Sequence, residues 1–546
     1  MHMKIFTTLD WFVLLAFFSI LGYIIYRVIN QKQNTSEEYF LAGRNLGWFV
    51  IGASIFASNI GSEHIVGLAG TAANSGMVMG HYELHSWIIL LLGWFFVPFY
   101  LNSTVFTMPE FLEKRFSESS RWLLTIITLI SYVLTKVSVT VYAGAVVFET
   151  LMGIEFWSGA LLIVLVTGCY TVLGGLRAVI YTDALQAFVL VIGSITISII
   201  GLAKIGGWGN LVASLEPSRF NMFLPADHPD FPWVGMVFAP PIIGIWYWCT
   251  DQYIVQRVLS ARNINQARKG TIFAGYLKLL PILMFFVPGL IAYAMSKSGQ
   301  MSYASPDQVF PTLVRELLPT GIRGLVAGGL LAALMSSLSS VFNSCSTLFT
   351  MDIYKKINPH ADEKKLVLVG RVATAIVVLS GILWIPFIKA VSGGGLYTYL
   401  QSVQAYIAPP IASVFLLGLF WKRINATGAF TALVSGFSAG MIRLGLEINK
   451  ASLDTGGILY GIADLNFLYF AIFSFLACII ILIAVSMTTS EPDYEKIKGL
   501  TYDTVDKDGS VEETKVDKNY DKISSYIIII ILALILIYFS PIGIGG

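Results

Sequence analysis

The composition of this 546-residue chain indicates that it resides in a membrane. It is 56% hydrophobic and 12% charged, about half the charged fraction of an ordinary soluble protein, and its mean hydropathy is +0.73. A net charge of +2, spread over many short connections, gives no electrostatic support for binding a nucleic acid. Four cysteines without CxxC or Cys/His ligand spacing do not predict a metal centre or a disulfide framework. We therefore expect an integral membrane protein in a lipid bilayer.

Fourteen apolar runs are long enough to cross the ~30 Å hydrocarbon core of a bilayer. They begin near residues 10, 46, 80, 121, 155, 178, 233, 269, 321, 365, 396, 426, 465 and 524. The first run lacks a small-residue cleavage site and continues into Arg27, so it predicts a retained helix rather than a signal peptide. Lysine and arginine collect in every second connection, which predicts that these connections are cytoplasmic and that both termini lie outside.

Two of the runs are interrupted. The second contains ASNIGSEH at 57–64, and the seventh contains PPIIGIWYWCTDQ at 240–252. With the first helix set aside, these are helices one and six of a ten-helix set, which are corresponding positions in two five-helix halves. Paired broken helices are typical of inverted-repeat transporters, in which free carbonyl and amide groups at the breaks bind ion and substrate.

This pattern predicts a division of the chain into six parts. They are an extra N-terminal helix and loop (1–45), a first repeat (46–205), a second repeat (206–420), two peripheral helices (421–489), a charged cytoplasmic linker (490–522) and a C-terminal helix (523–546).

Polar and aromatic residues inside the spans are suited to a neutral polyhydroxylated ligand. Glu83 begins the third span, where it is either an interfacial carboxylate in contact with water or the partner of Lys278, which lies inside its helix. Asn59 and Gln401 add amides that donate and accept hydrogen bonds. Aromatic faces that can pack on a sugar ring are offered by Tyr247, Trp248 and Tyr397. Lys136 leaves an anionic substrate open, unless it snorkels or is paired internally.

A second group of residues is suited to a cation. Ala333, Ser336, Ser337 and Ser340 share one helix face, although small hydroxylated residues also serve as simple packing surfaces. With backbone oxygens of Ala57 and Ile60 they would form an all-oxygen shell, which favours Na⁺. Asp183 either pairs with Arg177 at the cytoplasmic edge, binds a second cation or senses the membrane potential.

Several motifs between about Glu38 and Arg423 are more specific. They are SNIGS at 58–62, GGLRAVIYTD at 174–183, WYWCTDQ at 246–252 with VQR at 255–257, GYLK at 275–278, FNS at 342–344 through TLFTMDIY at 347–354, and FWKR at 420–423. Together they resemble the sodium/solute symporter family, and within it the sodium/glucose cotransporter branch.

The resemblance implies an all-α membrane protein of about 14 helices with the LeuT-type five-plus-five inverted repeat, whose first and sixth core helices are discontinuous. It implies a sugar site formed by Asn59, His64, Glu83, Tyr247, Trp248, Lys278 and Gln401, an outer gate at Tyr82 and Tyr397, and an inner gate at Tyr247. It implies a Na⁺ site at Ala57, Ile60, Ala333, Ser336 and Ser337. A second Na⁺ site, found in only some members, would involve Ser58, Asp183, Ser337, Ser339 and Ser340.

We expect Na⁺-coupled symport of a neutral monosaccharide such as glucose or galactose into the cell by alternating access. Na⁺ is the one cofactor expected, the plasma membrane is the expected location, and no obligatory protein partner is expected. Gly244 stands where sugar-transporting relatives commonly have Thr or Asn, which leaves the sugar open. The alternatives are another polyol or an acidic sugar, such as myo-inositol or sialic acid, and a sugar sensor that does not translocate. The sequence contains no set of a nucleophile and a base that would predict an enzyme.

Overall fold

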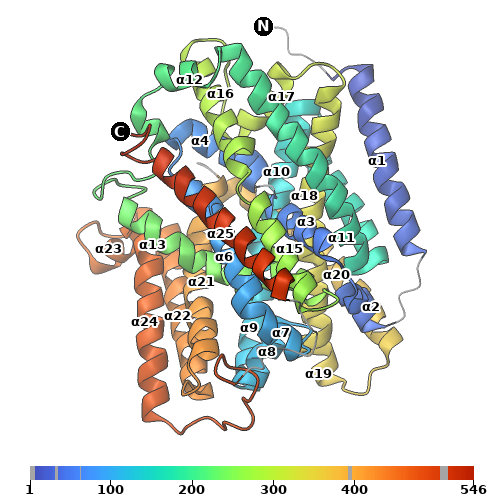
Figure 1. Ribbon diagram of the computed structural model, residues 1–546, viewed down its shortest axis with the longest axis vertical. Helices are drawn as coiled ribbons and strands as arrows, with labels where there is room; N and C mark the ends of the chain where they lie inside the picture. Colours follow the sequence, from blue (N-terminus) through green and yellow to red (C-terminus); the bar gives the residue numbers. More distant parts are fainter. Residues whose placement is uncertain (1–5, 31–34, 62, 392–395, 505–514) are drawn as a thin grey trace.

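The computed structural model describes residues 6–30, 35–61, 63–391, 396–504 and 515–546 (Figure 1). Every regular element in this part of the chain is a helix, and one isolated parallel bridge joins Leu46 to Ala261. The α-helices are α1 (Thr8–Ile29), α2 (Ser36–Leu41), α3 (Trp48–Asn59), α4 (Ala69–Ser75), α5 (Gly80–Glu83), α6 (Ser86–Leu91), α7 (Val97–Asn102), α8 (Met108–Arg115), α9 (Glu118–Ser131), α10 (Ser138–Val147), α11 (Phe156–Ile205), α12 (Trp208–Ser214), α13 (Trp233–Gly244), α14 (Gln252–Leu259), α15 (Ile264–Leu277), α16 (Val287–Lys297), α17 (Val309–Leu317), α18 (Ile322–Thr347), α19 (Lys355–Ile357), α20 (Glu363–Val391), α21 (Leu396–Phe420), α22 (Ala426–Ile448), α23 (Ile458–Asp464), α24 (Phe467–Thr488) and α25 (Lys515–Tyr538).

Short π-helical turns join several of these helices into longer rods. They are Glu63–Leu68, Leu92–Phe96, Tyr132–Val137, Phe148–Met152, Ile245–Thr250, Ile282–Phe286 and Leu348–Tyr354. Within the described residues, 13 helical segments are long and apolar enough to cross a membrane. The shorter apolar helix α3, continued by α4, corresponds to the interrupted second run, so the fourteen predicted crossing segments are all present as helices.

Both predicted interruptions are present. Helix α3 ends at Asn59, and Ile60 leaves the helical conformation (φ −76°, ψ 79°) before the chain resumes a helix at Glu63. The second break falls at Asp251, which is extended (φ −80°, ψ 127°) and caps α14 by accepting a hydrogen bond from the backbone N–H of Tyr253. Pro240 and Pro241 lie inside α13, so the helix continues past them, and the break comes only after the π-helical turn Ile245–Thr250.

The longest helix, α11, contains two spans joined by a kink. Gly175 has φ +54°, and a Cβ atom there would lie 2.7 Å from the carbonyl oxygen of Tyr39. Both the left-handed conformation and this close approach require glycine. The Gly-Gly pair of the sequence motif therefore makes the connection between the fifth and sixth predicted runs as short as one residue.

Helix α18 is the centre of the bundle. Almost all of its membrane-crossing window is buried, whereas only 22% of the windows in α1 and α25 is buried. α18 packs against α11, α1, α20, α10 and α3, and α3 in turn packs against α15 (Figure 1). The broken helix α3 is thus enclosed between α18 and α15, where lipid cannot reach its polar residues.

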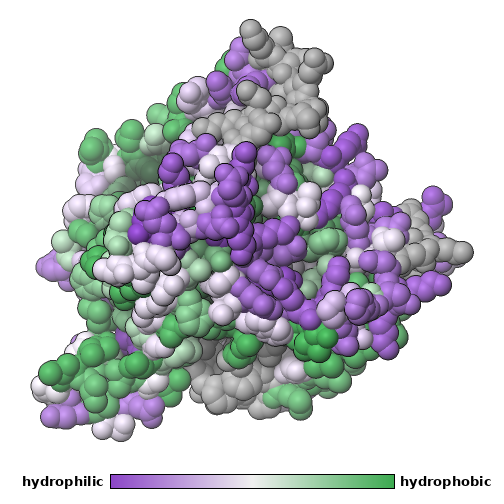
Figure 2. Space-filling view, turned by 90° about the horizontal axis from the view of Figure 1, so that it is seen from below, coloured by the Kyte–Doolittle hydropathy of each residue, from purple (hydrophilic) through white to green (hydrophobic). Residues whose placement is uncertain are grey.

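The two ends of the bundle are distinguished by the helices that reach them. Helix α1 begins and α25 ends at the same end, while α8 and α19, whose last turns are basic, lie at the opposite end (Figure 1). Viewed from that opposite end, hydrophilic side chains spread across the middle of the face and toward its right edge, and hydrophobic ones gather at the left and lower edges (Figure 2). A broad polar area at the end of an apolar helix bundle fits a membrane surface. Its assignment to the cytoplasm remains a prediction from the basic connections.

Candidate functional site

Glu83 occupies a second irregular position near the broken helix. It ends the short helix α5, and Leu84 (φ −83°, ψ 42°) interrupts the backbone before α6 begins. The carboxylate is 1% exposed, so the prediction of an interfacial residue in contact with water is wrong. It accepts hydrogen bonds from Lys278 Nζ (2.6 Å) and from the Tyr397 hydroxyl (2.9 Å), and His64 Nε2 lies 3.1 Å from its Oε1. Burial without these partners would be costly, and the backbone interruption aims Glu83 at them.

Lys278 links this carboxylate to the broken helix. It follows the last residue of α15, and its Nζ also donates to Asn59 Oδ1 at 2.6 Å. The amide nitrogen of Asn59 donates in turn to the Tyr247 hydroxyl at 3.3 Å. The Trp248 ring lies 5.4 Å from Lys278 Nζ, which adds a cation–π contact. The predicted pairing of Glu83 with Lys278 is therefore present, and it leaves this polar centre nearly neutral.

These side chains surround one narrow cavity of about 30 Å³. It is lined by Asn59, His64, Tyr82, Glu83, His85, Ile243, Gly244, Tyr247, Trp248, Lys278, Tyr397, Leu400, Gln401 and Gln404. All the residues predicted to contact sugar or to gate the site are among them. The open space suits about two water molecules, so a sugar ring requires the lining to move apart.

Polar atoms of the lining that are buried without a hydrogen-bond partner in the described structure include the Tyr82 hydroxyl, His85 Nε2 and Gln401 Oε1. Buried polar groups are nearly always paired, so atoms left over in a cavity indicate a place for water or a ligand. Sequence reasoning did not find His85 or Gln404. Their positions, two residues after Glu83 and one helical turn after Gln401, are the signals that could have identified them.

Gly244 is explained by His85. A Cβ atom on Gly244 would lie 2.5 Å from Ile88 Cδ1 and 2.9 Å from the His85 ring. The His85 imidazole, which accepts a hydrogen bond from Trp248 Nε1 at 3.4 Å, therefore occupies the space that a threonine or asparagine side chain would need. In this chain the polar group at that corner of the cavity comes from α5–α6 rather than from α13.

A second polar cluster surrounds Asp183 on α11. The carboxylate is fully buried and accepts hydrogen bonds from the hydroxyls of Ser54 (2.6 Å), Ser58 (3.2 Å) and Ser336 (2.5 Å). Arg257 Nη2 lies 3.7 Å from it. The prediction that Asp183 pairs with Arg177 is thus wrong, because the cation beside it comes from α14.

Several of the serines predicted for sodium lie at or beside this cluster. Ala57, Ile60 and Ala333 are buried at the end of α3 and on α18, two helices that pack against each other, and the Ser337 hydroxyl donates to the Ser58 carbonyl at 3.3 Å. Of the second predicted set, Ser58 and Ser340 meet beside Asp183, with 3.2 Å between their hydroxyl oxygens. Ser339 donates instead to the Ser336 carbonyl of its own helix. Within the described residues no group of three His, Cys, Asp or Glu side chains could hold a metal.

Lys136 is paired internally. Its Nζ lies 2.5 Å from Asp251 Oδ2 at the second helix break, 4.1 Å from the ring centre of Tyr253 and 4.9 Å from that of Tyr247. It is not among the residues that line the cavity. A carboxylate and aromatic faces thus already stabilise this ammonium group, which weakens the case for an anionic substrate held by Lys136.

Comparisons with known proteins identify the family of the chain. A model of the sodium:solute symporter family matches residues 39–436. The chain is 37% identical over 526 residues to sodium/glucose cotransporter 4 of Danio rerio, covering 90% of this chain and 80% of that protein. It is 39% identical over 530 residues to sodium/myo-inositol cotransporter 2 of Homo sapiens, covering 90% and 78%.

Solved structures show the same fold. The substrate-bound outward-open state of a Na⁺-coupled sialic acid symporter superimposes with a TM-score of 0.76 at 21% identity, covering 89% of this chain and 99% of that one. A nucleobase-cation-symport-1 family transporter in a closed conformation gives a TM-score of 0.52 at 14% identity, covering 84% and 96%. The fold is therefore the LeuT-like one. The chain belongs to the sodium:solute symporter family and is a Na⁺-coupled solute symporter.

Proposed function

We propose that this symporter couples Na⁺ entry to the uptake of a neutral polyhydroxylated solute, either a monosaccharide of the glucose or galactose type or the cyclic polyol myo-inositol. The observation that carries the proposal is the network joining Glu83, Lys278 and Asn59 in one cavity. The carboxylate and the ammonium group cancel in charge while offering acceptors and donors side by side. A neutral ligand with many hydroxyls fits this better than an ion does.

The remaining lining supports a ring-shaped polyol. The unpaired atoms of Tyr82, His85 and Gln401 can each bind a hydroxyl group, and Trp248 offers an aromatic face. Glucose and myo-inositol cotransporters stand together among the relatives at 37–39% identity, so both substrates remain in the proposal. An acidic sugar is less well supported because Lys136 is paired with Asp251.

Sodium is a co-transported ion of the family and is thus cargo rather than a resident cofactor. In the proposal, one Na⁺ binds between the end of α3 and α18, through backbone oxygens of Ala57, Ile60 and Ala333 and the hydroxyls of Ser336 and Ser337. A second would use Asp183, Ser58 and Ser340, with Ser337 and Ser339 moving from their present hydrogen bonds. Ion binding at α3 would favour the state with high sugar affinity.

Alternating access in this proposal uses aromatic gates on the two sides of the cavity. Tyr82 and Tyr397 close the outer side and Tyr247 closes the inner side. Tyr397 donates to Glu83, and Tyr247 accepts from Asn59, so both gates are tied to groups that would bind the sugar. A sugar that takes over these hydrogen bonds would loosen the gates. In the proposal the protein lies in the plasma membrane with its basic face in the cytoplasm. The membrane potential then contributes ~2.3 kcal/mol per 100 mV to the entry of each Na⁺.

Uptake into proteoliposomes tests the proposal. Glucose, galactose, myo-inositol and sialic acid are compared with an inward Na⁺ gradient and with K⁺ in its place. We expect Na⁺-driven uptake of at least one neutral substrate, and weak or no uptake of sialic acid. Uptake of sialic acid alone, or neutral uptake that ignores the Na⁺ gradient, would contradict the proposal. Binding without counterflow would instead indicate a sensor.

A pair of variants on α21 tests the site. Gln401→Ala removes an amide whose Oε1 faces the cavity, so we expect at least a tenfold rise in the substrate concentration for half-maximal uptake. Ser413→Ala is the matched control, since that buried hydroxyl donates to the Pro410 carbonyl of its own helix. Equal effects of the two variants would show that α21 is sensitive as a whole and would remove the assignment of Gln401.

A further inference from the structure

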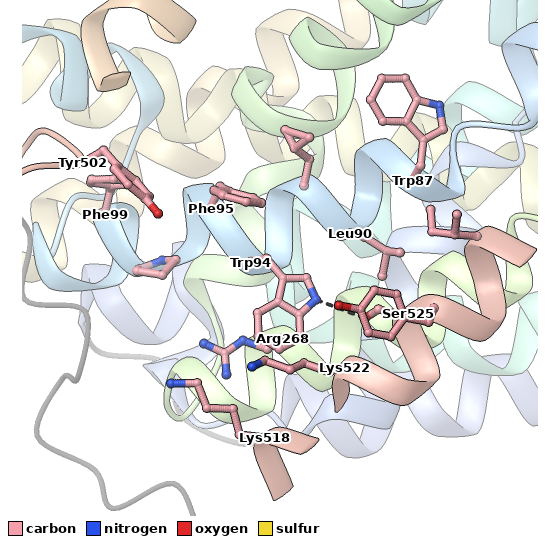
Figure 3. Close-up of a pocket in the computed structure, with 14 residues that line it drawn as sticks. Trp87, Leu90, Trp94, Phe95, Phe99, Arg268, Tyr502, Lys518, Lys522 and Ser525 are labelled. Atoms are coloured by element: carbon pink, nitrogen blue, oxygen red, sulfur yellow. Dashed lines mark hydrogen bonds between the residues drawn. The ribbon is translucent and has the colours of Figure 1, made fainter. Parts of the chain in front are cut away.

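A groove separate from the sugar cavity lies between α6–α7, α15 and α25. Its volume is about 660 Å³, and it shares no lining residue with the cavity around Glu83. The lining consists of Trp87, Leu90, Leu91, Trp94, Phe95, Pro98, Phe99, Arg268, Tyr502, Lys518, Lys522, Ser525, Tyr526 and Ile529 (Figure 3). The proposed transport cycle uses none of these residues.

Most of this groove is apolar and opens to the outside of the bundle. Phe95 and Ile529 are 39% and 40% exposed, and Tyr526 is 65% exposed. In a chain that crosses a membrane, such surfaces at the outside of the bundle meet lipid rather than water. The groove is therefore a place where a hydrocarbon chain can lie between α6 and α25.

One end of the groove is cationic. Lys518 and Lys522 lie one turn apart on the same face of α25, and Arg268 comes from the first turns of α15, with its guanidinium 4.4 Å from the Trp94 ring centre. Figure 3 shows the three cationic side chains together at one end, with Trp87 and Leu90 at the other. The charged residues among the described lining are these three cations, and the carboxylate of Asp521 is buried on the same helix outside the lining.

The polar and apolar parts are joined by tryptophan. Trp94 Nε1 donates to the Ser525 hydroxyl at 3.0 Å, and the Tyr276 hydroxyl donates to the Ser524 carbonyl at 3.0 Å, which ties α25 to α6–α7 and α15. Tryptophan with tyrosine and basic side chains is the usual composition at the depth where hydrocarbon meets lipid headgroups. These contacts place the cationic end at that level.

We propose that this groove binds one anionic phospholipid, with its phosphate at Lys518, Lys522 and Arg268 and an acyl chain along Trp87, Leu90 and Ile529. A free phosphate would leave the apolar groove uncovered, and a neutral lipid would bring no negative charge to Lys518 and Lys522. Basic pockets between membrane helices on the cytoplasmic side bind such headgroups, and that leaflet carries the anionic lipids. The predicted cytoplasmic position of the loops before α15 and α25 agrees with this.

The proposed lipid contacts two helices that also form the sugar site. Helix α6 follows Glu83 and His85, and α15 ends beside Lys278, so both helices wall the groove and position the cavity. A lipid that holds α25 against them stabilises the arrangement of Glu83 and Lys278. This consequence rests on the proposed function, whereas lipid binding itself does not and is measured separately.

Native mass spectrometry of the full chain in detergent, titrated with phosphatidylglycerol or phosphatidylcholine, tests the proposal. Each basic side chain near a phosphate contributes on the order of fivefold in affinity, so we expect one phosphatidylglycerol bound on the order of 100-fold more tightly than phosphatidylcholine. Lys518→Gln with Lys522→Gln keeps Arg268 and should lower this preference to about fivefold. The control, Lys496→Gln with Lys498→Gln, removes two exposed lysines of the linker outside the groove and keeps it.

Two further experiments decide whether the groove binds the lipid headgroup alone or the whole lipid with its acyl chain. Ile529→Trp fills the groove and leaves the lysines in place, so we expect loss of the tightly bound phosphatidylglycerol. Glycerol phosphate, which has the headgroup chemistry without acyl chains, should not displace it at equal concentration. Equal retention of the two lipids, equal loss in the control variant, full binding by Ile529→Trp, or displacement by glycerol phosphate would each overturn the proposal.

Discussion

The buried pair of Glu83 and Lys278 allows a quantitative test of the site by a double-mutant cycle. Lys278→Met removes the ammonium group that lies 2.6 Å from both Glu83 and Asn59, and Glu83→Gln removes the charge that Lys278 faces. Each single change leaves one buried charge without its main partner. The double variant removes both charges and leaves side chains of similar length.

The expected magnitudes follow from burial. Removing one partner of a buried ion pair costs about 3–5 kcal/mol, whereas replacing both is often neutral or stabilising. Lys278→Met should lie at the lower end, because the carboxylate keeps Tyr397 at 2.9 Å and His64 at 3.1 Å. For 546 residues, an unfolding entropy of about 2.1 cal/mol/K per residue makes 1 kcal/mol equal to about 1 °C in the unfolding midpoint. We expect both single variants to unfold about 3–5 °C lower and the double variant within about 2 °C of the parent.

The assay is thermal unfolding of the purified protein in detergent, with substrate binding measured on the same samples. All three variants should bind sugar weakly, since the polar contacts are lost whether or not stability recovers. Unfolding midpoints that add, so that the double variant falls by the sum of the single shifts, would refute the reasoning that the two charges compensate each other. So would single variants that match the parent.

Three further changes test other parts of the site. Asp183→Asn removes the negative charge that the hydroxyls of Ser54 and Ser336 face, so we expect the Na⁺ concentration for half-maximal uptake to rise at least tenfold. An unchanged value would contradict an ion-binding role. Lys136→Gln breaks the 2.5 Å pair with Asp251, so we expect faster sugar exchange through a loosened inner gate. Lys136→Arg keeps the charge and should not show this effect. Exchange equal to the parent in Lys136→Gln would show that the pair does not hold the inner gate closed. Gly244→Thr would place a Cβ 2.9 Å from His85, so overpacking of about 1–3 kcal/mol should lower sugar affinity at least fivefold in competition uptake, and undiminished affinity would show that this corner does not contact the ligand.

The fold was predictable because its main signals are local. Apolar length, the alternation of basic connections and two polar interruptions at corresponding places were sufficient to predict the crossing segments and the broken pair. The position of the second break was not predictable from the prolines. Pro240 and Pro241 fit into α13, and the helix instead stops where Asp251 can cap the next one. Capping and proline both favour helix boundaries, and only packing decides which one applies.

The site was predictable in its members but not in all of its contacts. The sugar-site and gate residues taken over from the resemblance do surround one cavity, and the pairing of Glu83 with Lys278 followed from the cost of burying each alone. The partner of Asp183 was missed, because Arg257 is 74 positions away in the sequence and lies beyond the second break. His85 was missed because its place depends on the small size of Gly244, a relation across two helices that no spacing rule contains.

The end of α3 connects the two proposed binding sites through adjacent residues. The Ser58 hydroxyl bonds Asp183 and its carbonyl accepts from Tyr253, while Asn59 contacts Lys278 and Tyr247.

The Lys136 ammonium group joins these two sets of contacts, because it lies 4.1 Å from the Tyr253 ring centre and 4.9 Å from that of Tyr247. A displacement of Ser58 at its ion-binding side can therefore reach the inner gate, Tyr247, through Tyr253 and Lys136. It can also reach Tyr247 through Asn59, the next residue of the same helix. Coupling requires an element that both ligands bias, and a helix end that already lacks its regular hydrogen bonds can shift at little cost. The unwound segment after Asn59 meets that requirement, which is a physical reason for the polar interruption to stand in the middle of an apolar span.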